Sequence, residues 1–217
     1  MRYNWIDAKD YTMNCFLLFD RWALRWIFTD RGGLDGFSTG GEYRLAMAKA
    51  LRRYPHVAEY VRAKAPECGA FLDEIQAVPP GDWSEAEMRE AETRVLQAHE
   101  TFVVYVDPEA MNRVNYIRNW DAKYLYELVD LPGKIVLDVG SGTGRLAFAA
   151  AKLALRVYAS EPCDCLREYM RDRIRAEGIQ NVKVLDGEVL DLPYEDDTFD
   201  VVLSGHVIGD SYEEEIA

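Results

Sequence analysis

A short glycine-rich stretch holds the residues of this sequence that are best placed to bind a ligand. An apolar run at residues 135–139 leads into three glycines at alternate positions, Gly140, Gly142 and Gly144, and an alanine-rich segment follows. The run is typical of a strand buried on both faces of a parallel sheet, and the glycines allow a sharp turn and a close approach of a ligand to the backbone. The first N–H groups of the following helix face this loop, so the pattern indicates a site for a polar or anionic group.

Two common glycine-rich loops do not fit this spacing. The dinucleotide-binding fingerprint requires G-x-G-x-x-G, whereas here the third glycine comes one residue early and Arg145 takes the position of the last glycine. A phosphate-binding P-loop ends in Gly-Lys followed by Ser or Thr, and this loop does not. The spacing therefore disfavours a nicotinamide or flavin site and a P-loop. A tight turn in an ordinary α/β protein is the plain alternative.

Residues 138–144 resemble the first motif of the class I S-adenosylmethionine-dependent methyltransferases, an acidic residue followed by x-Gly-x-Gly-x-Gly. The resemblance implies S-adenosylmethionine as the cofactor and S-adenosylhomocysteine as the product. The backbone of the glycine loop would take the carboxylate of the cofactor, while Asp138 would orient the loop and offer an acceptor towards the amino group. The resemblance assigns further cofactor contacts to Ser141, Pro162, Ser204 and Tyr116.

The ribose and adenine of that cofactor imply acidic residues after the next two strands. Glu161 directly follows the second expected strand and matches the second motif of the family, where a carboxylate accepts hydrogen bonds from the two ribose hydroxyls. Residues 187–194 resemble the family's Gly-Asp-x-x-x-Leu-Pro-Phe stretch, which assigns the adenine amine to Glu188 and a backbone N–H to Val189. Glu188 stands where Asp is commoner in the family, and Asp186 is the reserve candidate.

The acceptor side of the site is expected after the fourth strand, where residues 203–206 read Leu-Ser-Gly-His. This is not the Asn/Asp-Pro-Pro-Tyr signature of amino-directed DNA and protein glutamine methyltransferases. His206 is the candidate catalytic residue, because an imidazole can remove a proton from an oxygen, nitrogen or sulfur acceptor near neutral pH. A histidine that only packs against the cofactor is the alternative. Methyl transfer needs alignment above all, and proximity supplies on the order of 7–11 kcal/mol of the barrier.

The composition narrows the kind of partner and the compartment. The 217 residues carry a formal charge of −13, from 25 basic and 38 acidic residues, without a basic run. Such a field repels nucleic acid and anionic membranes, so a small-molecule substrate is expected. Four irregularly spaced cysteines favour a reducing cytoplasm, and Cys163-Asp164-Cys165 lacks a second ligand pair for zinc, so no metal is expected. The apolar residues 11–28 include three charged side chains and do not read as a membrane span.

The first half of the sequence reads as helical up to about residue 130. Residues 11–28 form a helix-length segment crowded with aromatic side chains, which indicates a core or the lining of a substrate cavity. Ser84 and Glu87 have the spacing of a capping box, which predicts the start of a later helix. Residues 101–106 either continue that helix or form a short strand. We expect a helical N-terminal cap or substrate region over residues 1–107.

From residue 135 onward the pattern changes to strands and helices in alternation. The expected strands lie at residues 135–139, 156–160, 182–185 and 199–204. Strands separated by helix-length segments predict a doubly wound, mostly parallel, Rossmann-like α/β sheet. We expect an S-adenosylmethionine-binding methyltransferase domain over residues 108–217.

The sheet implied by the resemblance has seven strands, but only residues 205–217 follow the fourth. We therefore expect a domain that is incomplete at its C-terminus, in which the apolar residues 201–203 form an uncovered edge. A partner chain, in a homodimer or by strand exchange, or residues 101–106 would cover this edge. The sequence thus predicts a methyltransferase for a small molecule, in a form that truncation would impair. The alternatives are a non-catalytic S-adenosylmethionine-binding or partner-binding protein of the same fold, and a nucleotide-dependent oxidoreductase.

Overall fold

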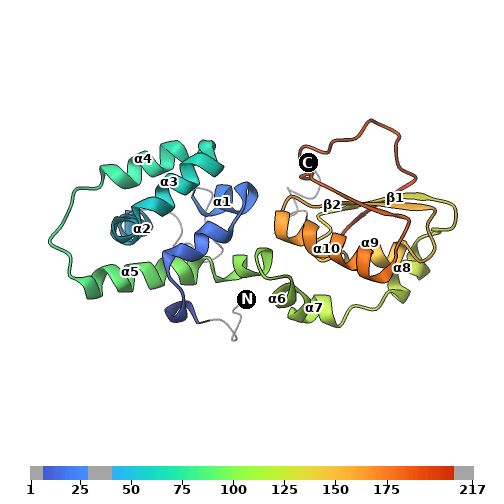
Figure 1. Cartoon of the computed structure of the whole chain (residues 1–217), viewed down its shortest axis with the longest axis horizontal. Helices are drawn as coiled ribbons and strands as arrows, with labels where there is room; N and C mark the ends of the chain where they lie inside the picture. The colour runs from blue at the N-terminus through green and yellow to red at the C-terminus, as the bar shows by residue number, and fades with distance from the viewer. Residues whose placement is uncertain (1–6, 29–40, 208–217) are drawn as a thin grey trace. The chain divides into compact units, whose positions relative to one another are not determined.

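The computed structural model describes residues 7–28 and 41–207 of the chain. The chain divides into two compact units, Met1–Val106 and Asp107–Ala217 (Figure 1). Each unit has a hydrophobic core of its own, as expected of an independently packed part of a chain.

The described residues of the Met1–Val106 unit are helical, as the sequence predicted. Helices α2 and α5 pack along each other, and the core around them includes Tyr43, Phe16 and Phe28. The predicted capping box opens α5, since the Ser84 N–H donates to Glu87 Oε2 at 2.8 Å and the Glu87 N–H donates to Ser84 Oγ at 3.3 Å. The helices are α1 (Arg21–Ile27), α2 (Gly41–Arg53), α3 (Pro55–Lys64), α4 (Gly69–Ala77) and α5 (Glu85–Ala98), and the short 3-10 helices are η1 (Ala8–Asp10), η2 (Met13–Leu18), η3 (Pro66–Cys68) and η4 (Glu100–Tyr105).

Two expectations for this unit were wrong. The aromatic-rich residues 11–28 do not form one helix, because the Asp20 carboxylate accepts the N–H groups of Trp22 and Ala23 and so starts α1 after the 3-10 helix η2. The alternative of a strand at residues 101–106 is also wrong. This segment forms η4, and therefore it cannot cover a sheet edge as a paired strand.

The Asp107–Ala217 unit holds a parallel sheet, as predicted. Its strands are β1 (Ile135–Val139), β2 (Arg156–Ser160), β3 (Val182–Leu185) and β4 (Val201–Ser204), in the spatial order β3-β2-β1-β4. Its helices are α6 (Pro108–Arg113), α7 (Asn115–Arg118), α8 (Lys123–Leu128), α9 (Arg145–Ala150) and α10 (Asp164–Glu177). The chain steps from β1 outward to β2 and β3 and then returns to the far side of β1. This reversal beside β1 is the kind of position at which doubly wound sheets bind ligands.

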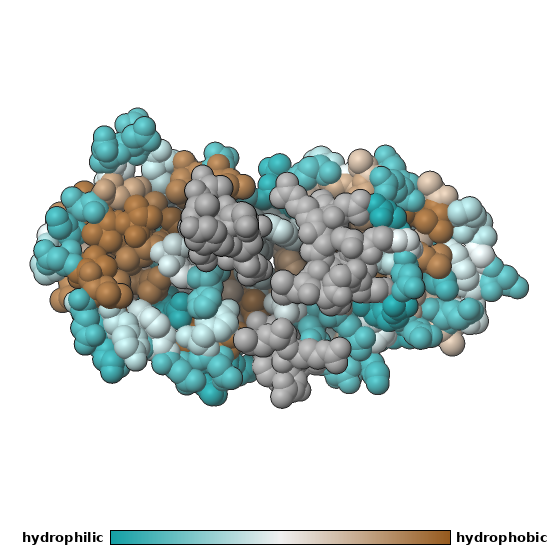
Figure 2. Space-filling view, turned by 180° about the vertical axis from the view of Figure 1, so that it is seen from behind, coloured by the Kyte–Doolittle hydropathy of each residue, from teal (hydrophilic) through white to brown (hydrophobic). Residues whose placement is uncertain are grey.

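The core of this unit lies on one face of the sheet. Helices α9 and α10 cover this face and lie below the strands in Figure 1, and the side chains of Val136, Val157 and Leu203 pack against them. Gly178, with a φ of 66°, ends α10 in the left-handed conformation that glycine adopts most readily. Figure 2, which shows the molecule from behind, shows hydrophobic side chains gathered over this unit.

Strand β4 is an edge strand among the described residues. It pairs with β1 along one side, and Val202 is 62% exposed. The expectation that residues 201–203 form an uncovered edge stays a prediction. The expectation that residues 213–217 begin a helix concerns residues outside those described.

Candidate functional site

The glycine loop follows β1 at the carboxyl edge of the sheet. Gly140, Gly142 and Gly144 have φ angles of 64°, 57° and 85°, which side chains with a Cβ rarely adopt. At Gly142 a Cβ would lie 3.0 Å from the Met111 Sδ atom, so α6 packs closely over the loop. The loop therefore needs glycine at this position both for its backbone conformation and for the close packing of α6.

Several N–H groups of the loop bond within the chain. The Ser141 N–H donates to the Ser160 carbonyl at 3.1 Å, and the Gly144 N–H donates to the Ser141 carbonyl at 2.8 Å. The Gly142 N–H donates to Glu161 Oε2 at 2.8 Å. A cofactor carboxylate at this loop would have to share these donors, which the sequence did not reveal.

Asp138 joins the end of β1 to the start of α9. Its side chain is buried, and its Oδ2 accepts the Ala147 N–H at 3.0 Å. The Ser141 hydroxyl donates to the Asp138 backbone carbonyl at 2.8 Å. Burial raises the pKa of Asp138 to about 7, because desolvation disfavours the charged carboxylate. Asp138 is thus in a position to orient the loop, while its contact with the cofactor amino group stays a prediction.

Glu161 links the first and second motifs directly. It is 4% exposed, its Oε2 accepts the Gly142 N–H, and its Oε1 accepts the Cys163 N–H at 3.0 Å. A carboxylate can accept about four hydrogen bonds, so one side chain can hold the loop and also accept bonds from a ribose diol. Pro162 follows it and is half-buried. The chemistry of this position therefore fits the ribose of S-adenosylmethionine.

The residues expected at the adenine follow β3. Gly187 packs so closely on β2 that a Cβ there would lie 2.3 Å from Ser160 Oγ. Glu188 is half-buried and begins a tight turn in which the Asp191 N–H donates to the Glu188 carbonyl at 3.0 Å, and Val189 is 41% exposed. The reserve candidate Asp186 instead accepts a hydrogen bond from Arg167 at 3.0 Å.

The residues expected at the acceptor side lie together after β4. The imidazole of His206 stacks on the Tyr116 ring with the centroids 4.1 Å apart, and both side chains are exposed. His206 has a φ of 61°, an uncommon conformation for a residue with a side chain. Arg145 Nη1 donates to the Tyr116 carbonyl at 3.0 Å, and the guanidinium lies over the Trp120 ring. Ser204 ends β4, in register with Val139, and is exposed.

The structure therefore brings the predicted residues to the carboxyl edge of one sheet. Sequence reasoning missed Met111, Arg145 and Arg167 as neighbours of this edge. Arg145 was noticed only because it breaks the dinucleotide fingerprint, and the sequence carries no signal for Met111, whose contact depends on how α6 folds back.

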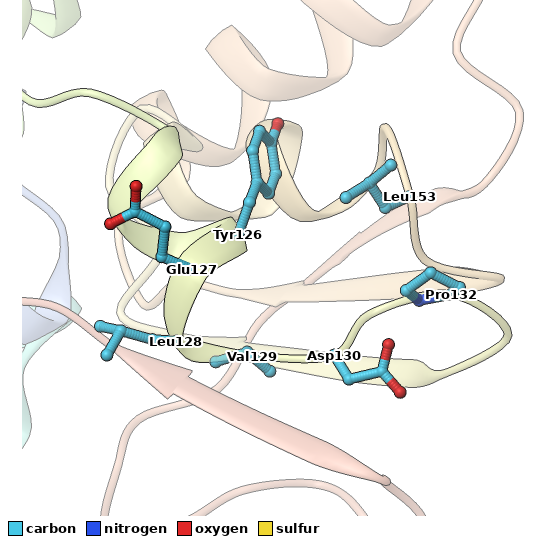
Figure 3. Close-up of a pocket in the computed structure, with 7 residues that line it drawn as sticks. All are labelled: Tyr126, Glu127, Leu128, Val129, Asp130, Pro132 and Leu153. Carbon is cyan, nitrogen blue, oxygen red and sulfur yellow. The ribbon is translucent and has the colours of Figure 1, made fainter.

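A surface hollow of about 420 Å³ lies elsewhere in the same unit, around the segment that leads into β1 (Figure 3). Its lining contains none of the predicted site residues and consists of Tyr126, Glu127, Leu128, Val129, Asp130, Pro132 and Leu153. Within residues 7–28 and 41–207, the acidic, histidine and cysteine side chains form no group of three that could hold a metal ion. In the same ranges, every helix is too short or too polar to cross a membrane.

Comparisons with known proteins agree with the geometry of this edge. Residues 136–216 match the family model described as methyltransferase domain. A demethylmenaquinone methyltransferase of Geobacillus stearothermophilus is 29% identical over 120 residues, which are 52% of this chain and 50% of that protein. A ribosomal protein L11 methyltransferase of Caldanaerobacter subterraneus is 35% identical over 69 residues, which are 31% of this chain and 22% of that protein.

A solved structure, a SAM dependent methyltransferase from Aquifex aeolicus, is 27% identical over 44% of this chain and 53% of that chain, with a TM-score of 0.40. The chain spans between 22% and 50% of the length of the two curated relatives. The family model covers the glycine loop, Glu161 and every later motif up to His206. Residues 136–216 therefore match the methyltransferase domain of the class I S-adenosylmethionine-dependent methyltransferases, a family whose cofactor is S-adenosylmethionine.

Proposed function

We propose that this protein transfers a methyl group from S-adenosylmethionine to a small molecule. The observation that carries the proposal is the 2.8 Å hydrogen bond from the Gly142 N–H to Glu161, because it joins the two motifs expected to hold neighbouring parts of this cofactor, its amino-acid end and its ribose. Two relatives are named as methyltransferases, which supports an enzyme over a protein that only binds the cofactor.

The residues of the carboxyl edge have separate roles in this proposal. When bound, S-adenosylmethionine supplies a methyl group on a positively charged sulfur. Asp138 and the glycine loop hold the amino-acid end, Glu161 accepts bonds from the ribose hydroxyls, and Glu188 and Val189 receive the adenine. Further contacts to the cofactor come from Ser141, Pro162, Ser204 and Tyr116. Because these residues fix the cofactor from several strand ends, they supply the alignment on which methyl transfer depends.

His206 is the proposed general base on the acceptor side. Its exposed ring lies just after β4 and stacks on the Tyr116 ring. Arg145 donates a hydrogen bond to the backbone carbonyl of Tyr116 and so helps to hold Tyr116 in place. A base fixed beside the cofactor loop can take a proton from an acceptor as the methyl group arrives.

The substrate and the surroundings complete the proposal. The acidic charge of −13 argues for a small molecule rather than nucleic acid or an anionic membrane. Residues 1–107 are the proposed substrate region. The described cysteines, at positions 15, 68, 163 and 165, form no disulfide with one another, and the cytoplasm is the proposed location. The open edge of β4 is the proposed contact of a homodimer, with strand exchange as its extreme form.

Two measurements test the activity. Titration with S-adenosylmethionine, S-adenosylhomocysteine and NAD, followed by calorimetry, is expected to show binding of the first two alone. Incubation with methyl-labelled S-adenosylmethionine and a small-molecule extract is expected to move the label into an extract component. Binding of S-adenosylmethionine without methyl transfer to any component would favour the non-catalytic alternative. Binding of NAD alone would overturn the assignment of S-adenosylmethionine as the cofactor.

A further inference from the structure

A buried arginine connects the ends of two strands at the cofactor edge. The Arg167 side chain on α10 is 9% exposed. Its Nη1 donates to the Glu161 carbonyl at 2.6 Å and to Asp186 Oδ1 at 3.0 Å, while its Nη2 bonds to the Asp164 carboxylate. One guanidinium thus contacts the residue that follows β2, the residue that follows β3, and the first turn of its own helix.

These contacts surround the nucleoside half of the site. Glu161 is the proposed ribose ligand, and Asp186 lies two residues before Glu188, the proposed adenine ligand. The guanidinium is a planar fork that holds several acceptors at once, and such charge-assisted bonds are stronger and more directional than neutral ones. The bond to the Glu161 carbonyl fixes the backbone from which the ribose ligand projects. The bond to Asp186 fixes the start of the adenine segment.

We propose that Arg167 is a positioning residue for the nucleoside half of S-adenosylmethionine, a role that rests on the proposed function. It holds the backbone of Glu161 and the segment after β3 at a fixed separation. The residue that contacts the ribose and the residue that contacts the adenine can then bind the same nucleoside. The same bonds turn Asp186 towards α10. Asp186 therefore supports the site through Arg167, and the adenine amine is left to Glu188.

A matched arginine on the same helix allows a controlled test. Arg171 Nη2 donates to the Val184 carbonyl within β3 at 3.1 Å, and Nη1 pairs with Glu168, so these bonds reach neither Glu161 nor Asp186. The two ligands are S-adenosylhomocysteine and 5′-methylthioadenosine, which lacks the amino-acid end. Dissociation constants of both are measured by calorimetry for the full chain, Arg167→Met and Arg171→Met, together with the melting temperature of each variant.

Arg167→Met is expected to raise the dissociation constants of both ligands by the same factor, about tenfold or more, because both ligands contain the nucleoside. Arg171→Met is expected to keep both dissociation constants. A purely structural role would instead leave both constants of Arg167→Met at the wild-type value, or lower the affinity of both variants alike, and either result overturns the proposal. Wild-type protein that binds neither ligand would overturn the proposed function, and this role with it.

A second pair of variants covers the case in which Arg167→Met does not fold. Asp186→Asn changes an exposed side chain. It is expected to weaken the binding of 5′-methylthioadenosine and of S-adenosylhomocysteine by equal factors. Arg167→Lys keeps the positive charge but not the planar guanidinium. Its affinity for both ligands is expected to lie between those of wild type and Arg167→Met. Wild-type affinity for both ligands in Asp186→Asn and Arg167→Lys would refute the positioning role.

Discussion

The imidazole of His206 stacks on the phenol ring of Tyr116, with 4.1 Å between the ring centroids and 37° between the ring planes. The contact joins the helical segment before β1 to the turn after β4, which are 90 positions apart in sequence. Arg145 strengthens this junction from the first position of α9, because it donates to the Tyr116 carbonyl. The proposed acceptor side therefore draws on three separate segments of one unit.

Replacing His206 tests its proposed role as a base. His206→Asn removes the imidazole but keeps a residue that tolerates a positive φ. We expect kcat to fall by roughly a hundredfold or more while the affinity for S-adenosylhomocysteine stays unchanged. The measurement is steady-state methyl transfer beside calorimetric binding. Tyr124→Phe, a change at an exposed ring of α8 outside the predicted site, is the control and should stay close to wild type. An unchanged kcat in His206→Asn would leave the ring with a packing role only.

Replacing Gly142 tests the cofactor loop. A Cβ at this position must adopt a φ of 57° and would lie 3.0 Å from Met111 Sδ. Gly142→Ala should therefore lose the melting-temperature increase that S-adenosylhomocysteine gives, which for a ligand at a hundred times its dissociation constant corresponds to about 2.7 kcal/mol. Gly178→Ala is matched in backbone, with a φ of 66°, but has open space around it. It should cost about 1–2 kcal/mol of stability and keep the ligand response. A full ligand response in Gly142→Ala would refute the loop assignment.

Asp138 should make stability depend on pH. Burial raises the pKa of its carboxyl to about 7, whereas an unfolded chain has a value of about 3.9. The folded state therefore holds this proton more tightly. The stability that the protonated group contributes is complete below about pH 4 and is lost as pH rises through about 7. Asp138→Asn has no such group.

The measurement is urea unfolding of wild type and Asp138→Asn at several pH values. Relative to the variant, wild type should lose roughly 3 kcal/mol of unfolding free energy between pH 5 and pH 8. The difference between the two proteins isolates Asp138, because every other titrating group is common to both. A difference that stays constant over this range would show that the carboxyl titrates at its ordinary value.

Ser84→Ala should destabilise the Met1–Val106 unit without affecting the cofactor. The substitution removes the hydroxyl that accepts the Glu87 N–H in the capping box of α5. Loss of such a cap costs about 1 kcal/mol. Chemical unfolding should show this loss, and calorimetry should show wild-type affinity for S-adenosylhomocysteine. Weaker cofactor binding in this variant would contradict the assignment of the cofactor to residues 108–217.

The parts of the fold that could be predicted from the sequence are those coded by local patterns. The apolar run of β1 and the capping box at Ser84 each depend on a few adjacent residues, and each was found. Residues 11–28 were misread because apolar periodicity outweighed the single N-cap at Asp20. The 3-10 helix at Glu100–Tyr105 was left open, because β-branched and aromatic residues also favour strands.

The site could be predicted only as far as its motifs reach. Glu161 was placed correctly after β2, but its bond to the Gly142 N–H joins residues 19 positions apart and has no sequence signal. The contacts of Arg167 also have no sequence signal, because Arg167 is one of several arginines on an amphipathic helix. The same holds for Met111, which packs over the glycine loop. Such contacts depend on how separate elements pack, which a single sequence does not encode locally.

Strand β1 is paired along both sides, with β2 and with β4, whereas β4 has one partner among the described residues. Amides at a singly paired edge become accessible to solvent in local fluctuations, while those of a central strand exchange only when most of the domain unfolds. The glycine loop follows the slow-exchanging strand, and His206 follows the fast-exchanging one. Deuterium uptake should therefore be rapid in β4, next to the proposed acceptor side, and slow in β1, next to the cofactor loop. Local opening of β4 would then interrupt the proposed methyl transfer well before the cofactor is released.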